Sequence, residues 1–185
     1  MEDSKIIALF FRRDQQAITE LAAKHGKSIY RTASNILGNA EDAEECTNDT
    51  YLAAWNSIPP QSPAPLVTYV CRIARNLAVS RYHANTAKKR NSFYDAALEE
   101  LEDSLAALET VETEYDAREL TAAINCFLDG LSYDDRFLFL RRYWYADGVS
   151  ASGAMMGLSP HRVSVRLFRI RERLERQLVK EGILV

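Results

Sequence analysis

The chain concentrates arginine at helical spacing between Gly157 and Leu178. Five arginines recur three or four residues apart, which puts them on one helical face: Arg162, Arg166, Arg169, Arg173 and Arg176. An adjacent face is apolar, with Val163, Leu167, Ile170, Leu174 and Leu178. A guanidinium can neutralise a phosphate or bind both acceptors of guanine, so this face has the chemistry of a DNA reader. The alternative is an amphipathic surface helix whose arginines are simply solvated.

The residues before this helix favour the DNA-binding interpretation. Ser159 and Pro160 are typical of a helix start, with the serine as N-cap and the proline at the first helical position. Upstream, residues 155–158 end a shorter helix in a turn that contains Gly157. A short helix, a tight turn and a longer basic helix form a helix-turn-helix, which reads the major groove of DNA.

Carboxylates lie on one face of another expected helix, over residues 40–57. Asp42, Glu45 and Asp49 are spaced at i, i+3 and i+7, so their side chains point the same way. Three interpretations are open: a binding patch for a basic partner, a solvated acidic face, or a divalent-metal site. Because no further ligand lies nearby in the sequence, we expect no metal there.

A third set of residues has the chemistry to hold single-stranded DNA. Within residues 68–82, cations and groups that can stack on or hydrogen-bond to bases alternate: Tyr69, Arg72, Arg75, Asn76, Arg81 and Tyr82. The segment follows a loop with four prolines between Pro59 and Pro65, which cannot continue a helix. The alternative for Tyr69 is that it faces the core together with Ile73 and Leu77, at a spacing of four.

The elements that must position these residues are all helical. The chain has only seven Gly and five Pro in 185 residues, with 47% hydrophobic residues. We expect a first helix near residues 4–24, a break at His25-Gly26, and further helices to residue 37, over 40–57 and over 66–83. A second unit begins near Arg118, and Ser132 caps a helix in which Asp135 reaches back to complete a capping box. The predicted fold is therefore all-α, with two small helical domains (1–85 and 118–185) joined by an acidic linker (86–117).

The charge distribution agrees with this division. The net charge is −3, but residues 51–94 contain no acid, residues 91–117 contain nine acids and no Lys or Arg, and residues 161–180 contain seven Lys or Arg. Two basic stretches separated by an acidic one predict two surfaces that face phosphate. The acidic segment argues against tight DNA binding by the free chain.

Several classes of protein are not supported. His25, His83 and His161 have no nucleophile or carboxylate at motif spacing, and there is no phosphate-binding loop, so we expect neither an enzyme nor a cofactor. The three cysteines are scattered, which predicts a reduced, cytoplasmic protein without a zinc site. No apolar run is long enough to span a membrane.

Three stretches in order resemble the extracytoplasmic-function (ECF) class of bacterial sigma factors, the RNA polymerase subunits that select promoters. EDAEECTNDTYLAAWNSIPP, residues 41–60, is similar to the helix that docks on the polymerase clamp. TYVCRIARNLAVSRY, residues 68–82, is similar to the helix that opens and reads the −10 element. Residues 139–174 are similar to the domain that binds the −35 element.

The resemblance implies partners and site residues. Core RNA polymerase would be bound by Asp42, Glu45, Asn48 and Asp49. The −10 element would be bound by Tyr69, Arg72, Arg75, Asn76 and Arg81. The −35 element would be bound by His161, Arg162, Ser164, Arg166 and Arg169. The resemblance also implies an anti-sigma partner. It further implies that the chain has no catalytic activity and that the polymerase carries out catalysis.

The chain departs from the family pattern in two places. Ser80 stands where many members carry Asp. Ser152-Gly153 stands where the family has a large aliphatic residue followed by Ala, and because Gly weakens a helix we expect a short or frayed first helix in the helix-turn-helix. The alternative function is a stand-alone regulator that binds operator DNA as a dimer through residues 139–178.

Overall fold

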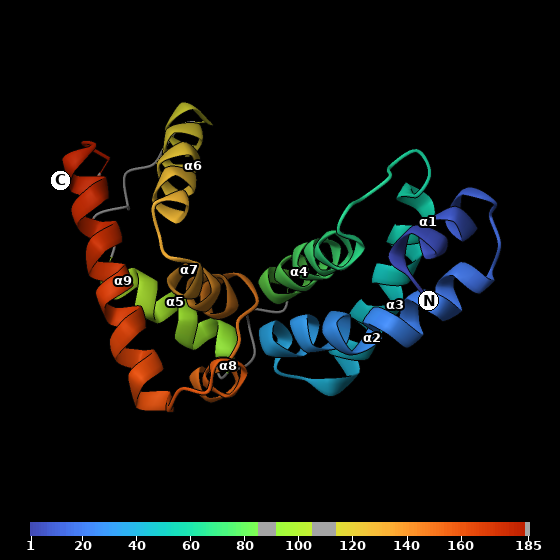
Figure 1. Cartoon of the computed structure of the whole chain (residues 1–185), viewed down its shortest axis with the longest axis horizontal. Helices are drawn as coiled ribbons and strands as arrows, with labels where there is room; N and C mark the ends of the chain where they lie inside the picture. Colours follow the sequence, from blue (N-terminus) through green and yellow to red (C-terminus); the bar gives the residue numbers. More distant parts are fainter. Residues whose placement is uncertain (85–91, 105–113, 184–185) are drawn as a thin grey trace. The chain divides into compact units, whose positions relative to one another are not determined.

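The computed structural model describes residues 1–84, 92–104 and 114–183, and over these ranges it consists of helices without strands (Figure 1). The all-α prediction is confirmed. The chain divides into two compact units, Met1–Phe93 and Tyr94–Val185, each with its own hydrophobic core. Among the described residues, no helix combines the length and the hydropathy needed to cross a bilayer.

Over its described residues 1–84, the first unit contains the helices α1 (Asp3–Phe11), α2 (Gln16–Leu37), α3 (Ala40–Ser57) and α4 (Leu66–Ala84). The long helix α2 packs against α1, α3 and α4, and α3 packs against α4. The core draws fully buried side chains from each helix, including Phe10, Leu21, Ala54 and Val70. The predicted limits of α3 and the start of α4 after the proline loop agree with the structure.

The break between α1 and α2 lies elsewhere than predicted. The chain leaves the helix at Arg12, Arg13 adopts a left-handed φ of 56°, and α2 then continues through His25 and Gly26 without interruption. A Cβ at Gly26 would lie 2.8 Å from the hydroxyl oxygen of Tyr51, so a larger residue here would require the Tyr51 side chain to shift. The prediction of a break at His25-Gly26 is therefore wrong.

His25 itself ties α1 to α2. Its side chain is buried, and Nε2 lies 2.8 Å from Oδ1 of Asp3, which also pairs with Lys24 at 2.7 Å. Partial burial raises the pKa of Asp3, but the hydrogen bonds with Lys24 and His25 outweigh this effect and hold the pKa below its usual value.

The second unit contains α5 (Phe93–Ser104), α6 (Glu114–Asp129), α7 (Tyr133–Phe139), a π-helical turn (Leu140–Trp144), α8 (Val149–Met156) and α9 (Pro160–Lys180). The buried apolar face of α9 forms much of its core: Val163, Leu167, Ile170, Leu174 and Leu178. This is the apolar face that the sequence predicts. It packs with Phe127, Leu138 and Phe139 from α6 and α7.

Helix α5 lies within the segment predicted as an acidic linker. Ala97 is buried in the core of the second unit, and Leu101 packs against that core. The second unit therefore begins at residue 94 rather than near Arg118. Residues 85–91 and 105–113 of the predicted linker lie outside the described residues.

The π-helical turn follows α7 directly. The N–H of Tyr145 donates to the carbonyl oxygen of Leu140 at 3.0 Å, five residues back instead of four. Two consecutive polar residues of this turn, Arg142 and Tyr143, are buried. Both donate hydrogen bonds to Glu100 of α5, which also accepts one from Arg171 of α9 at 3.2 Å.

Candidate functional site

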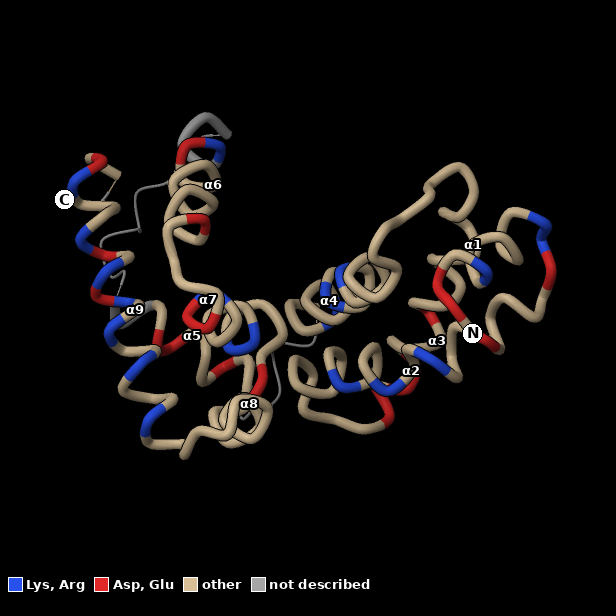
Figure 2. The backbone as a smooth tube through the Cα atoms, viewed as in Figure 1, with Lys and Arg blue, Asp and Glu red and all other residues tan. Residues whose placement is uncertain are grey.

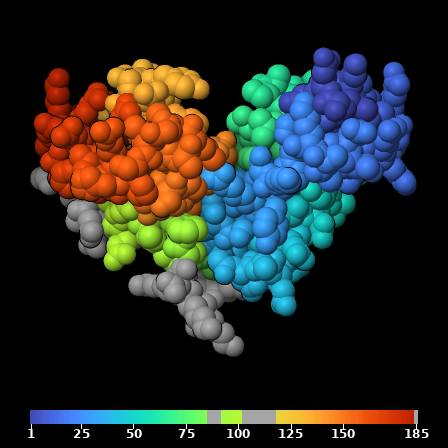
Figure 3. Space-filling model, turned by 60° about the horizontal axis from the view of Figure 1, so that its bottom comes forward, coloured from blue at the N-terminus to red at the C-terminus, as the bar shows by residue number. Residues whose placement is uncertain are grey.

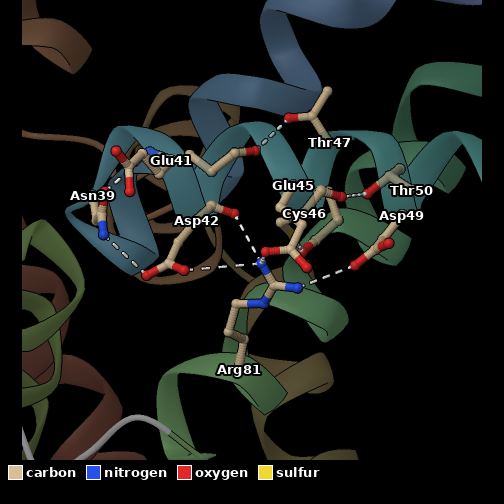
Figure 4. A network of polar contacts seen from close by, with 11 residues as sticks. Asn39, Glu41, Asp42, Glu45, Cys46, Thr47, Asp49, Thr50 and Arg81 are labelled. Atoms are coloured by element: carbon tan, nitrogen blue, oxygen red, sulfur yellow. Dashed lines mark hydrogen bonds and ion pairs between the residues drawn. The ribbon is translucent and has the colours of Figure 1, made fainter.

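The acidic face of α3 binds a cation from α4 (Figure 4). Nη1 of Arg81 lies 2.9 Å from Oε2 of Glu45, and Nη2 lies 3.2 Å from Oδ2 of Asp49. Nη1 also donates to the backbone carbonyl of Asp42 at 3.3 Å, and its distance to the Asp42 carboxylate is 4.0 Å. The structure thus brings together three residues predicted to bind polymerase with one predicted to bind the −10 element.

The carboxylates of this cluster remain open to solvent. Side-chain exposure is 66% for Glu45 and 48% for Asp49, against 22% for Arg81. The hydrogen bond with Glu45 raises the pKa of Arg81, so the guanidinium stays charged. Three carboxylates against one guanidinium leave the cluster with a net negative charge.

The α3 helix is set so that these carboxylates point outward. Its small residues Ala43, Cys46, Thr50 and Ala54 are buried. The side chain of Asn39 caps the helix by accepting a hydrogen bond from the N–H of Glu41 at 3.0 Å. Asn48, the remaining predicted polymerase contact, is exposed.

The carboxylates of α3 do not form a metal site. Among the described residues, no group of three or more His, Cys, Asp or Glu is arranged to hold a metal ion. The cation that the carboxylates contact is the guanidinium of Arg81.

Helix α4 exposes a polar stripe along one face. Thr68, Arg72, Asn76, Ser80 and His83 are all exposed and lie three or four residues apart. The opposite face is buried through Leu66, Val70, Ala74 and Ala78. The predicted contacts Arg72 and Asn76 therefore lie on one surface, whereas Arg75 is half-buried beside it.

For Tyr69 the sequence leaves open either a contact with DNA or packing in the core, and its position is compatible with both. Its ring is half-buried and packs against the core of the first unit. The guanidinium carbon of Arg72 lies 5.4 Å from the ring centroid, within cation–π range. The partly exposed ring and its arginine thus form one side of the α4 stripe.

In the second unit, α8 and α9 form the predicted helix-turn-helix. Ser159 caps α9 by accepting a hydrogen bond from the N–H of Arg162, and Pro160 is the first helical residue. Gly157 ends α8 in the left-handed conformation, with φ of 65°. Both features were predicted from local sequence.

Gly153 was predicted to weaken the first helix of the helix-turn-helix, but in the structure it permits a close approach of the turn to α8. Helix α8 is short, as expected, with eight residues. A Cβ on Gly153, however, would lie 2.6 Å from the carbonyl oxygen of Leu158, which is closer than atoms can approach. The glycine lets the turn close against α8, and it fits the turn instead of merely weakening the helix.

Basic residues recur along α9, as the blue segments of the tube show (Figure 2), and several of them lie on its outer face. Leu158, His161, Arg162, Val165, Arg166 and Arg169 line a shallow hollow there. Ser164 is exposed near the start of the helix. Figure 3 shows the orange and red part of the second unit, which includes α8 and α9, as one continuous surface.

The arginines of α9 have different surroundings. Arg162 and Arg169 are exposed, whereas Arg166 is half-buried and its Nε donates to Oδ1 of Asp135 at 2.7 Å. Asp135 thus binds Arg166 and not its own N-cap as predicted, although Ser132 caps α7 as expected by accepting from the N–H of Asp135.

Sequence reasoning missed the inward-facing Arg171. Its Nη1 donates to the hydroxyl oxygen of Tyr143 at 2.7 Å and to Glu100. Burial raises the pKa of Tyr143 well above its usual value, although the hydrogen bond from Arg171 opposes the shift. The one available signal was the position of Arg171 beside Ile170 on the apolar side of α9.

Comparisons with known proteins found a family match, a curated relative and a solved structure. Residues 21–88, which hold α3, α4 and most of α2, match sigma-70 region 2. The chain is 25% identical over 181 residues to the ECF RNA polymerase sigma factor SigE of Mycolicibacterium smegmatis, covering 88% of this chain and 62% of that protein. The solved structure of CnrH in complex with the cytosolic domain of CnrY is 22% identical, with 96% of this chain and 97% of that chain covered and a TM-score of 0.45.

Within the first unit, residues 21–88 are thus similar to sigma-70 region 2. The chain is similar to an ECF RNA polymerase sigma factor. It spans about three-fifths of the length of SigE.

Proposed function

We propose that the protein is a promoter-selecting subunit that directs transcription initiation by core RNA polymerase. The single observation that carries this proposal is the match of residues 21–88 to sigma-70 region 2. That stretch contains both the carboxylate cluster of α3 and the polar stripe of α4. The protein would act in the cytoplasm and supply binding surfaces, while the polymerase supplies the chemistry.

The acidic face of α3 is the proposed polymerase contact. Asp42, Glu45, Asn48 and Asp49 present carboxylates and an amide on the exposed side of a helix whose other side is buried. Opposite charges across an interface mainly raise the association rate and fix the orientation of the complex. A basic surface on the polymerase therefore fits this face.

The stripe of α4 is the proposed −10 contact. Arg72 and Asn76 are exposed together, with the ring of Tyr69 beside them, and Arg75 lies at the edge of the stripe. Cations hold a DNA backbone, and an aromatic ring and an amide can bind an unpaired base. Arg81 reaches DNA in this proposal only if it leaves the carboxylates of α3.

The outer face of α9 is the proposed −35 contact. His161, Arg162 and Ser164 are exposed near the start of a helix that follows a tight turn, the position from which a helix-turn-helix reads bases. Arg169 is exposed further along the same helix, where a phosphate contact fits better. Arg166 borders the same hollow. We also propose an anti-sigma partner that covers these surfaces. This part of the proposal rests only on the resemblance to ECF sigma factors.

A pull-down with core polymerase, followed by run-off transcription on a genomic library, tests the function. We expect a stable complex and a discrete set of start sites. A chain that fails to bind polymerase but elutes as a dimer and binds duplex DNA alone would contradict the proposal and favour an operator-binding regulator.

A further experiment separates the two DNA contacts. Arg75→Ala and Asn76→Ala should leave −35 footprints intact but prevent strand opening, which permanganate reactivity of −10 thymines reports. Thr121→Ala on α6, an exposed position outside the proposed surfaces, is the control. Normal melting by the α4 variants would show that α4 is not the −10 helix.

A further inference from the structure

Arg166 is attached to a neighbouring helix by two contacts. Its Nε donates to Oδ1 of Asp135 at 2.7 Å, and its Nη2 lies 3.5 Å from Oδ2 of Asp134. The side chain of Asp135 is 19% exposed and that of Asp134 is 53% exposed. The shorter and less solvated contact, to Asp135, is therefore the stronger restraint.

Asp135 is itself held firmly. Its backbone N–H donates to Oγ of Ser132 at 3.2 Å, which fixes the first turn of α7. Leu138, one turn further along α7, is fully buried in the core that also contains Leu167, the neighbour of Arg166 on α9. The Asp135 carboxylate thus belongs to α7, which packs against α9 in a shared core.

The two contacts leave part of the guanidinium for another ligand. A guanidinium has five N–H donors, and these contacts use Nε and one N–H of Nη2. The remaining donors include a parallel pair on Nη1 and Nη2, which is the arrangement that matches O6 and N7 of guanine.

The position of Arg166 at the surface suits that use. It is 34% exposed by side chain and borders the shallow hollow on the outer face of α9, together with Arg162, Val165 and Arg169. Arg171 on the same helix differs, because it is 13% exposed and its guanidinium contacts Glu100 and Tyr143. Arg166 is therefore both restrained and at the surface proposed to face the −35 element.

We infer that Asp135 is a positioning residue that holds the Arg166 guanidinium ready to read one guanine of the −35 element. The inference rests on the proposed function of α9. A restrained arginine loses less side-chain freedom when it binds, and its donor pair points in one direction. Asp135 therefore sets base preference at a single position without touching DNA.

The test uses full-length protein assembled with core polymerase and a library of promoter duplexes with a randomised −35 segment. Wild type is compared with Asp135→Ala, Asp135→Asn, Arg166→Ala and the double variant Asp135→Ala/Arg166→Ala. The readout is the enrichment of guanine over the other bases at each position. Asp129→Asn is the matched control, because Asp129 is an exposed carboxylate of the same unit that pairs with Arg136 instead.

We expect Arg166→Ala to abolish a guanine preference at one position, and Asp135→Ala to lower it there by about three- to tenfold, a part of what one bidentate contact supplies. Asp135→Asn, which keeps an acceptor, should be intermediate. The double variant should match Arg166→Ala alone, since the carboxylate acts only through the arginine. Preferences at the other positions should not change, and Asp129→Asn should behave as wild type.

Two results would overturn the inference while leaving the proposed function intact. One is a guanine preference that Arg166→Ala removes and Asp135→Ala does not change. The other is an Asp135→Ala variant that changes enrichment equally at all positions, as a purely electrostatic or folding effect would. A wild-type complex without any −35 preference would instead overturn the proposed function of α9.

Discussion

Arg81 shows how the role of a single side chain depends on its partners in the fold. By sequence it belongs to a basic helix and was predicted to bind DNA. In the folded chain its guanidinium contacts Glu45 and Asp49 on α3, as well as the backbone of Asp42. The acidic face therefore carries one internal cation, and a basic partner would meet carboxylates that are already partly neutralised.

The proposed polymerase contact on α3 can be tested by reversing charge. Asp42→Lys together with Asp49→Lys should abolish association with core polymerase, because the face becomes positive once Arg81 is included. Both side chains are partly exposed, at 32% and 48%, so the fold should survive. A pull-down measures association with core polymerase, and circular dichroism checks that the variant is folded.

The control for this variant is Glu2→Lys, which reverses an exposed charge on another element of the same unit. It should bind as wild type does. Unchanged binding by the Asp42/Asp49 double variant would remove α3 from the proposed interface.

The buried thiol of Cys46 makes stability depend on pH in the alkaline range. Burial raises its pKa from 9.0 to about 11, with Arg81 opposing the shift. Between these values the unfolded chain releases the proton and the folded chain keeps it, so the free energy of unfolding falls as pH rises. The loss should be on the order of 1 kcal/mol.

Urea unfolding at several pH values from 8 to 11 measures this dependence. Cys46→Ala should reduce the slope over that range, leaving the slope from Tyr51 and Tyr143, whose pKa values burial also raises. Cys126→Ala, at an exposed cysteine, should not change it. An equal slope in Cys46→Ala and wild type would contradict the assignment.

At the scale of elements, the turn between α8 and α9 depends on a close approach. Gly153→Ala should destabilise the second unit by about 1–3 kcal/mol, because its Cβ would clash with the carbonyl of Leu158. This cost exceeds the gain in helix propensity. Thermal unfolding measures it, and −35 binding should weaken in parallel.

Ser150→Ala is the control, since Ser150 is exposed in the same helix. It should change the melting temperature little. A Gly153→Ala variant that is as stable as wild type would mean that the turn is able to move away from α8.

The elements that could be predicted from sequence are those with local causes. Ser159, Pro160 and Gly157 fix the turn and the start of α9 through contacts within a few residues. The limits of α3 follow likewise from the cap at Asn39 and the prolines after Ile58. Spacing alone also identified the buried face of α9.

The features that could not be predicted have partners far along the chain. A glycine inside a helix predicts a break, and no nearby residue indicates that the hydroxyl of Tyr51 lies against Gly26 in a continuous helix. Arginine spacing on α9 could not show that Arg166 binds Asp135 or that Arg171 turns inward to Glu100, 71 residues away. Each of these contacts depends on tertiary packing, which cannot be predicted from neighbouring residues in the sequence.

At the scale of the whole molecule, the acidic stretch does not simply separate the two units. It starts near residue 91, and α5 inside it supplies Ala97, Leu101 and Glu100 to the second unit. The carboxylate of Glu100 accepts from Arg142, Tyr143 and Arg171. Loss of α5 would leave these three donors without their common acceptor.

A fragment of residues 92–185 should therefore be more stable than one of residues 118–185. The shorter fragment exposes apolar core surface and leaves the Arg142 side chain, which is 5% exposed, without its carboxylate. Thermal unfolding of the two fragments measures the difference. The longer fragment with Glu100→Gln, which keeps the apolar contacts of α5, should fall between them.

Equal melting temperatures for the two fragments would show that α5 adds nothing to the second unit. In that case the boundary predicted near Arg118 would be the functional one. The comparison also indicates which fragment is suitable for measuring −35 binding by the isolated unit.

The π-helical turn after α7 has a consequence for the history of the sequence. A turn closed five residues back holds one residue more than a regular helical turn, and each residue of a helix rotates the next by about 100°. Losing that residue would swing Arg142 and Tyr143 away from Glu100. In related sequences, the extra residue of this turn and a carboxylate at the position of Glu100 should therefore be present together or absent together.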